Sequence, residues 1–64
     1  MKEVLLRGYG SILTAELDAN VLKAEGIKCR VQRGGLHQNF GSLAGADIYV
    51  LENDLEKAKD VLTI

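Results

Sequence analysis

The seven residues from Ile27 to Arg33, written IKCRVQR, decide the fold class of this chain. Apolar and polar side chains alternate through the whole stretch, so that Ile27, Cys29 and Val31 fall on one side. A period of two residues is typical of a β-strand with one buried face. The stretch therefore predicts a strand in a sheet that has one side on a core, with Cys29 packed there.

A helix is expected directly before this strand. Ser11 is a suitable N-cap, because its hydroxyl can accept a hydrogen bond from an amide of the first turn. Residues 12–25 contain no Gly or Pro and are rich in Leu and Ala, which favours a helix. Gly26 follows, and a left-handed glycine commonly ends a helix.

Two more strands and a second helix complete the pattern. Residues 4–7 predict a short first strand that ends in a turn at residues 8–10, and residues 46–51 predict a third strand. Asn53 and Glu56 have the spacing of a capping box at the start of a second helix. The apolar stripe of that helix consists of Leu55, Ala58, Val61 and Leu62.

These elements make one α+β domain over residues 1–64, in the order β-α-β-β-α. The first strand, the crossover helix and the second strand form a right-handed unit, into which the third strand can insert antiparallel. This is a ferredoxin-like two-layer sandwich that lacks or nearly lacks the fourth strand. Whether Thr63 and Ile64 add a vestigial fourth strand stays open. The first strand is left at an open edge, and such edges invite pairing with another chain.

The amino-acid composition makes several classes of function less favoured. Eight basic and nine acidic residues give a formal charge of −1, without the basic excess that nucleic-acid binders use. The chain has no apolar run long enough to span a bilayer, its first residues predict no signal peptide, and its unpaired cysteine fits a reducing compartment. We therefore expect a cytoplasmic protein. One Cys and one His cannot build a four-ligand zinc site, and we predict no metal or cofactor.

Small size favours a homo-oligomer. A chain of 64 residues buries little core, and a single cysteine excludes an intrachain disulfide as compensation. The first helix is also apolar on two sides. One stripe packs on the sheet, and the other packs either beside the second helix or in a subunit interface; for the interface we name Ile12, Ala15, Ala19 and Leu22.

Two places are candidates for a binding site. The first is the loop 34–45, which is long for so small a domain and carries His37, Asn39 and Phe40; a simple flexible loop is the alternative. The second is the open side of the sheet, where strand alternation places Leu5, Arg7, Arg30, Tyr49 and Leu51. Tyr49 can stack on a base there, or it can cover the side chain of Arg30 on the neighbouring strand.

Two segments carry a resemblance to a known family. Residues 22–31, LKAEGIKCRV, and residues 48–62, IYVLENDLEKAKDVL, resemble the bacterial family described as putative prokaryotic signal-transducing protein. The resemblance implies a signalling role without a known reaction, and a fold distantly related to that of the PII-type regulators. In those regulators a long loop between the second and third strands docks on partners, which implies a similar use of the loop 34–45. ATP binding is not predicted.

We therefore expect a non-enzymatic regulatory or binding domain. It would present the loop 34–45 or the open sheet face to a protein or a small metabolite. The alternative is a module that contacts RNA or a nucleotide through the open face, and an enzyme of unknown reaction is a second alternative.

Overall fold

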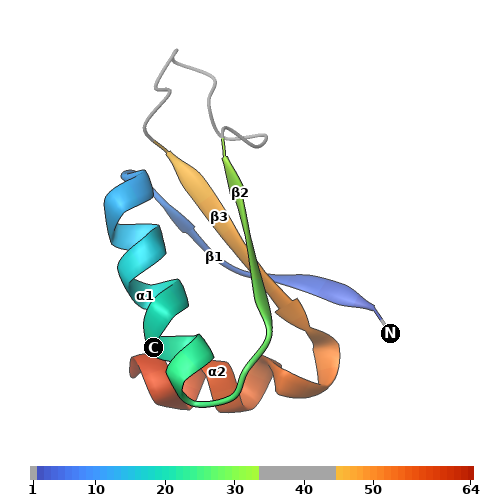
Figure 1. Ribbon diagram of the computed structural model, residues 1–64. Helices are drawn as coiled ribbons and strands as arrows, with labels where there is room; N and C mark the ends of the chain where they lie inside the picture. The colour runs from blue at the N-terminus through green and yellow to red at the C-terminus, as the bar shows by residue number, and fades with distance from the viewer. Residues whose placement is uncertain (1, 34–44) are drawn as a thin grey trace.

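The computed structural model describes residues 2–33 and 45–64, whose elements follow the predicted order. Three strands form one antiparallel sheet in which β3 lies between β1 and β2 (Figure 1). This confirms the ferredoxin-like α+β arrangement, with β1 and β2 as the two edges of the described sheet. The elements are β1 (Glu3–Tyr9), α1 (Ile12–Ala24), β2 (Cys29–Arg33), β3 (Ala46–Leu51), the 3-10 turn η1 (Glu52–Asp54) and α2 (Leu55–Leu62).

The central strand β3 supplies the middle of the core. Ala46, Ile48 and Val50 are buried on the side that faces the helices, as the alternation predicts. Ile27 is also buried, but it precedes β2, which begins only at Cys29. One face of the sheet is therefore apolar and covered, as expected.

The edge strand β1 contains a β-bulge that the sequence pattern does not reveal. Leu5 pairs with Tyr49, but the next pair joins Arg7 to Ile48, so Leu6 is an extra residue. Leu6 is buried in the core, and the alternation of the strand changes sides after it. β1 also runs on to Tyr9, so the turn predicted at residues 8–10 starts later than expected.

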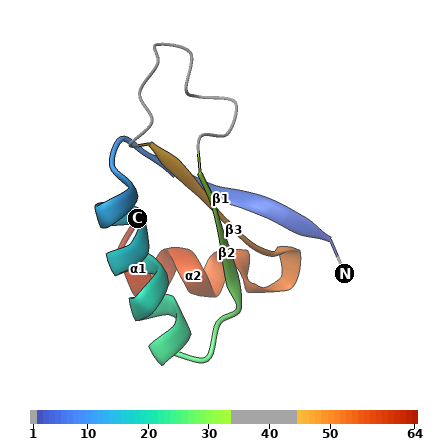
Figure 2. The same cartoon turned by 45° about the horizontal axis from the view of Figure 1, so that its top comes forward.

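Both helices contribute to the same core, so the domain has two layers (Figures 1 and 2). Helix α2 lies crosswise to α1 and contacts it (Figure 1). The stripe of α1 that faces the core, hereafter the inner stripe, consists of Ile12, Ala15, Ala19 and Leu22. Ala15, Ala19 and Leu22 are at most 2% exposed, so the predicted subunit interface at this stripe is wrong. Small alanines allow the close approach of α1, and the stripe packs inside the domain instead.

The ends of α1 are capped as predicted. The Ser11 hydroxyl accepts a hydrogen bond from the amide of Leu13 at 3.2 Å, with Ser11 in an extended conformation. At the other end Gly26 has a φ of 81°, in the left-handed region where glycine is favoured. The amide of Ile27 then donates to the carbonyl of Leu22 at 2.9 Å, which leads the chain into β2.

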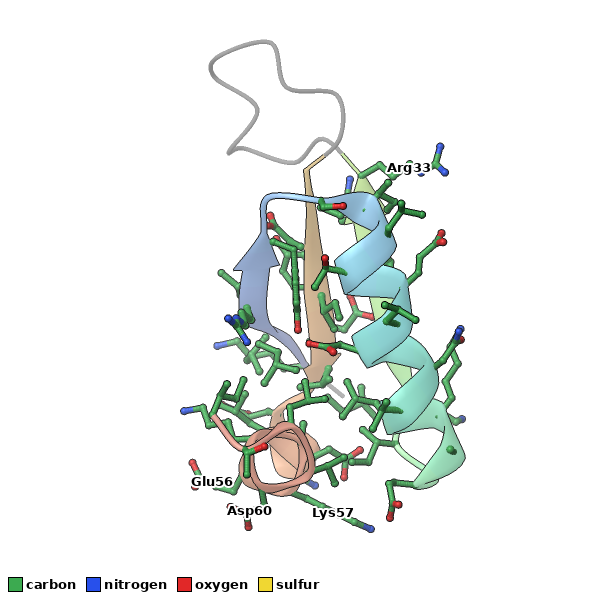
Figure 3. The ribbon with its side chains drawn as sticks, turned by 90° about the vertical axis from the view of Figure 1, so that its left-hand side faces the viewer. Arg33, Glu56, Lys57 and Asp60 are labelled. Atoms are coloured by element: carbon green, nitrogen blue, oxygen red, sulfur yellow. The ribbon has the colours of Figure 1, made fainter. Side chains whose placement is uncertain are left out.

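Helix α2 starts differently from the prediction. Asn53 lies inside η1, and Asp54 precedes the α-helix without a side-chain capping bond, so the capping box is wrong. The apolar stripe of α2 is confirmed, with Ala58 fully buried. Figure 3 shows Glu56, Lys57 and Asp60 pointing away from the sheet on the outer side of α2, and Arg33 at the far end of the molecule.

The C-terminus forms a helix cap. Thr63 adopts the left-handed conformation with a φ of 57°, and the amide of Ile64 donates back to the carbonyl of Lys59 at 2.9 Å. Residues 63–64 are therefore not a fourth strand. No helix in residues 2–33 and 45–64 has both the length and the apolar character needed to cross a membrane.

Candidate functional site

The side of the sheet that faces away from the helices, hereafter the open face, is organised by a row across all three strands. In the register of the sheet, Tyr49 of β3 lies between Leu5 of β1 and Arg30 of β2. Side chains that are directly opposite in an antiparallel sheet lie on the same face and interact. Leu5 is 45% exposed even though it is apolar, since no described helix covers this face.

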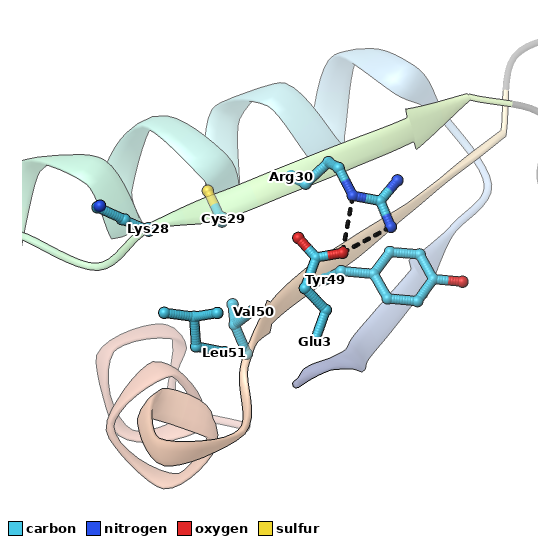
Figure 4. Close-up of a pocket in the computed structure, with 7 residues that line it drawn as sticks. All are labelled: Glu3, Lys28, Cys29, Arg30, Tyr49, Val50 and Leu51. Atoms are coloured by element: carbon cyan, nitrogen blue, oxygen red, sulfur yellow. Dashed lines mark hydrogen bonds and ion pairs between the residues drawn. The ribbon is translucent and has the colours of Figure 1, made fainter. Parts of the chain in front are cut away.

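The side chain of Arg30 contacts residues on both of the other strands. Its guanidinium carbon lies 4.7 Å from the centroid of the Tyr49 ring, within the range of a cation–π contact. Its Nε and Nη2 donate to Oε1 of Glu3 at 3.0 and 2.9 Å, so the side chain reaches from β2 across β3 to β1 (Figure 4). The hydrogen bond to Glu3 raises the pKa of the guanidinium, and Nη1 also donates to Gln32.

A small hollow lies beside this row. It has a volume of about 130 Å³, and its lining comes from one end of the sheet, where β1 and β2 begin and β3 ends: Glu3, Lys28, Cys29, Arg30, Tyr49, Val50 and Leu51 (Figure 4). Pockets that enclose drug-sized ligands have about 300–1,000 Å³, so this hollow does not enclose such a ligand. A wider depression of about 510 Å³ lies towards the start of α1, lined by Leu5, Gly8, Tyr9, Gly10 and Asp47.

Four of the five residues predicted for the open face are placed there together: Leu5, Arg30, Tyr49 and Leu51. Sequence reasoning missed Glu3, which makes the ion pair with Arg30. The signal was present, because Glu3 is two residues before Leu5 and a strand repeats its face every second residue.

Arg7 is not on the open face, and this prediction is wrong. Arg7 pairs with Ile48, whose side chain is buried under the helices. The extra residue Leu6 shifts the alternation of β1 by one position, so Arg7 lies on the helix side of the sheet instead of the open face. Its guanidinium carbon instead lies 5.2 Å from the centroid of the Tyr9 ring. The Tyr9 hydroxyl donates to Oδ2 of Asp18 on α1 at 2.6 Å.

Cys29 packs partly against the core, in agreement with its predicted place on the inner side of β2. Burial raises the pKa of its thiol, while the charge of Lys23 acts in the opposite direction. The Sγ atom lies 3.6 Å from the carbonyl oxygen of Ala19, to which it can donate. The thiol form is therefore favoured, which is the opposite of what a nucleophilic cysteine requires.

The predicted loop site, with His37, Asn39 and Phe40, lies outside the described residues. In the part of the chain that is described, no group of three His, Cys, Asp or Glu side chains could hold a metal ion. The open face is thus the candidate site that the structure allows us to examine.

A comparison with known protein families gives a match over nearly the whole chain. The family model described as "Putative prokaryotic signal transducing protein" matches residues 1–63. Searches of curated proteins and of solved structures gave no significant match.

Proposed function

Since the chain belongs to the family of putative prokaryotic signal transducing proteins, we propose that it is a non-enzymatic regulatory domain whose open face binds a protein partner. The observation that carries this proposal is the stack of the exposed Arg30 on the half-buried Tyr49, next to Leu5 and Leu51 on the open face. Tyr and Arg are the residue types that contribute most often to binding energy at protein interfaces. An apolar rim around them adds area that a partner can bury.

The ion pair between Arg30 and Glu3 suits reversible binding. Both side chains are close to half exposed, at 46% and 44%, and exposed ion pairs contribute little to stability. A carboxylate of a partner can therefore replace Glu3 at the guanidinium at little cost. The stack on Tyr49 holds the guanidinium in place, which reduces the entropy that binding would otherwise cost.

The other candidate functions have less support. An RNA base would have to displace Arg30 from the Tyr49 ring, and the net charge of −1 offers no basic excess for phosphates. Among the described residues, the hollows that this face offers a metabolite are a small one and a wide, open depression. An enzyme would need an activated group, and burial raises the pKa of the Cys29 thiol, which disfavours the reactive thiolate. The single cysteine also fits our proposal of a cytoplasmic location.

The proposal is tested by comparing variants in capture from a lysate of the source cells. Proteins retained by the wild-type chain should be lost with Arg30→Glu and with Tyr49→Ala. They should be kept with Lys57→Glu, which alters an exposed charge on the outer side of α2. If all variants retain the same proteins, the open face is not the binding site. A rise in melting temperature with a nucleotide or amino acid, abolished by Tyr49→Ala, would instead favour a metabolite sensor.

A further inference from the structure

Helix α1 exposes a ridge of large apolar side chains on the side opposite its inner stripe. This outer stripe consists of Leu13, Leu17 and Val21, whose exposed fractions are 69%, 66% and 45%. Their spacing of four residues aligns them in one ridge along the helix. Within the described chain no other element covers that side of α1 (Figures 1 and 2). A contiguous apolar surface of this kind marks an interaction site more often than an isolated exposed leucine does.

The flanks of the outer stripe carry charges in a definite order. On the flank nearer β2 lie Glu16, Asn20 and Lys23, which line a shallow depression together with Val31. Glu16 and Lys23 are seven residues apart, about 10 Å along the helix at 1.5 Å per residue. This flank therefore has a negative first half and a positive second half. On the opposite flank Asp18 is bonded to the Tyr9 hydroxyl.

We propose that a second copy of this chain packs on the outer stripe, with the two α1 helices antiparallel about a two-fold axis. A two-fold axis perpendicular to the helices brings the same flank of both copies together and reverses their directions. Glu16 of one copy then comes level with Lys23 of the partner subunit, and the pair occurs twice. Leu17 packs against Val21 of the partner subunit in the same arrangement.

A parallel pair of helices fits the charges less well. It would bring the Glu16 flank of one copy beside the Asp18 flank of the other, so that each attraction between Lys23 and Glu25 is offset by a repulsion between Glu16 and Asp18 at nearly the same level. On that second flank the antiparallel pair places Thr14 opposite Glu25 of the partner subunit and brings the two Asp18 residues to within three positions, about 4.5 Å, along the helix. The Tyr9 hydroxyl of each chain donates to its own Asp18, so this one like-charge contact is weaker than the two Glu16–Lys23 attractions. Complementary charges set orientation more than affinity, so the buried leucines supply the attraction and the ion pairs select the antiparallel form.

The interface would be small, and the association should depend on concentration. Helix α1 has 13 residues, so it is about 20 Å long. Contact along one such helix buries less than the roughly 800 Å² per partner of a standard interface. This dimer uses the side of the molecule away from the open face, so it is independent of the proposed partner site.

Sedimentation equilibrium over a wide range of chain concentrations tests the interface. The apparent mass of the wild-type chain should rise from 7.0 kDa towards twice that value. Leu17→Lys should stay at the monomer mass at every concentration. Leu5→Lys, which places the same charge on an exposed leucine of the open face, should dimerise like the wild type. Circular dichroism shows that each variant is folded.

A charge exchange tests the orientation. Glu16→Lys and Lys23→Glu should each weaken the dimer by about threefold or more at low salt, and the double variant should recover the wild-type dissociation constant. A wild-type chain that is monomeric throughout would overturn the proposal. So would Leu17→Lys dimerising as well as the wild type, Leu5→Lys abolishing the dimer, or a double variant as weak as the single ones.

Discussion

The phenol of Tyr9 and the carboxylate of Asp18 join the end of β1 to the middle of α1 by a hydrogen bond of 2.6 Å. The bulge at Leu6 makes this contact possible, because it brings Tyr9 to the helix side of the sheet. Tyr9→Phe removes the donor and leaves the ring. Hydrogen bonds to a charged group contribute about 1.5–3 kcal/mol, and partial exposure favours the lower end. We expect urea unfolding at pH 7 to show a loss of about 1–2 kcal/mol. Tyr49→Phe, which removes the other tyrosine hydroxyl, should cost less, and an equal loss would contradict this role of Tyr9.

Alkaline pH should unfold the protein partly through the same tyrosine. Burial, and then the hydrogen bond and charge of Asp18, raise the pKa of Tyr9 in the folded state. The folded chain therefore holds this proton more tightly than the unfolded chain, whose tyrosines titrate at about pH 10. The stabilisation is fully present below that pH and is lost as the pH rises further. Melting temperatures from pH 8 to 11 should fall more steeply for the wild type than for Tyr9→Phe. Identical slopes would show that the Tyr9 proton is not linked to folding.

Two glycines near the ends of α1 offer a matched pair of substitutions. A Cβ atom at Gly26 or Gly10 would meet nothing within 4 Å, but only Gly26 has a positive φ, of 81°. Gly26→Ala should destabilise the fold by about 1–2 kcal/mol, because a left-handed alanine is strained. Gly10→Ala should be neutral or stabilise by up to about 1 kcal/mol through the unfolded state. Chemical denaturation measures both, and equal effects would exclude backbone strain as the cause.

The two stripes of α1 should differ strongly in their contribution to stability. Leu22 on the inner stripe is fully buried, and Leu22→Ala should cost about 2–5 kcal/mol. Leu17 on the outer stripe is 66% exposed, and Leu17→Ala should change the stability of the monomer by about 0.5 kcal/mol or less. Unfolding at a low chain concentration keeps dimerisation out of the comparison. A large loss for Leu17→Ala under those conditions would mean that the outer stripe packs within one chain.

The sequence pattern could predict the elements whose alternation is clean. The strand residues Ala46, Ile48 and Val50 and the stripe of α2 follow a single period, so each has only one way to bury its apolar side. The strand order also followed, because a short crossover through one helix leaves few topologies.

The sequence pattern could not predict the structure where both sides of a strand or helix are equally apolar. Val4, Leu5 and Leu6 form an unbroken apolar run, in which an extra residue changes no hydrophobic signal, so the bulge and the position of Arg7 were missed. On α1 both the inner and the outer stripe are apolar, and which of them faces the core depends on how closely the helix can approach the sheet. Alanine lets the helix approach closely, which periodicity alone does not express.

The positive charge of Lys23 should increase the rate at which the Cys29 thiol is alkylated. Alkylation requires the thiolate, and burial raises the pKa of this thiol while Lys23 lowers it. Iodoacetamide at pH 8 should therefore modify folded Cys29 more slowly than the unfolded chain in urea. Lys23→Gln should slow the folded reaction further, whereas Lys57→Gln, on the outer side of α2, should leave it unchanged. Mass spectrometry follows the modification at a low chain concentration. A faster reaction in Lys23→Gln would mean that access to Sγ, rather than its charge state, limits the rate.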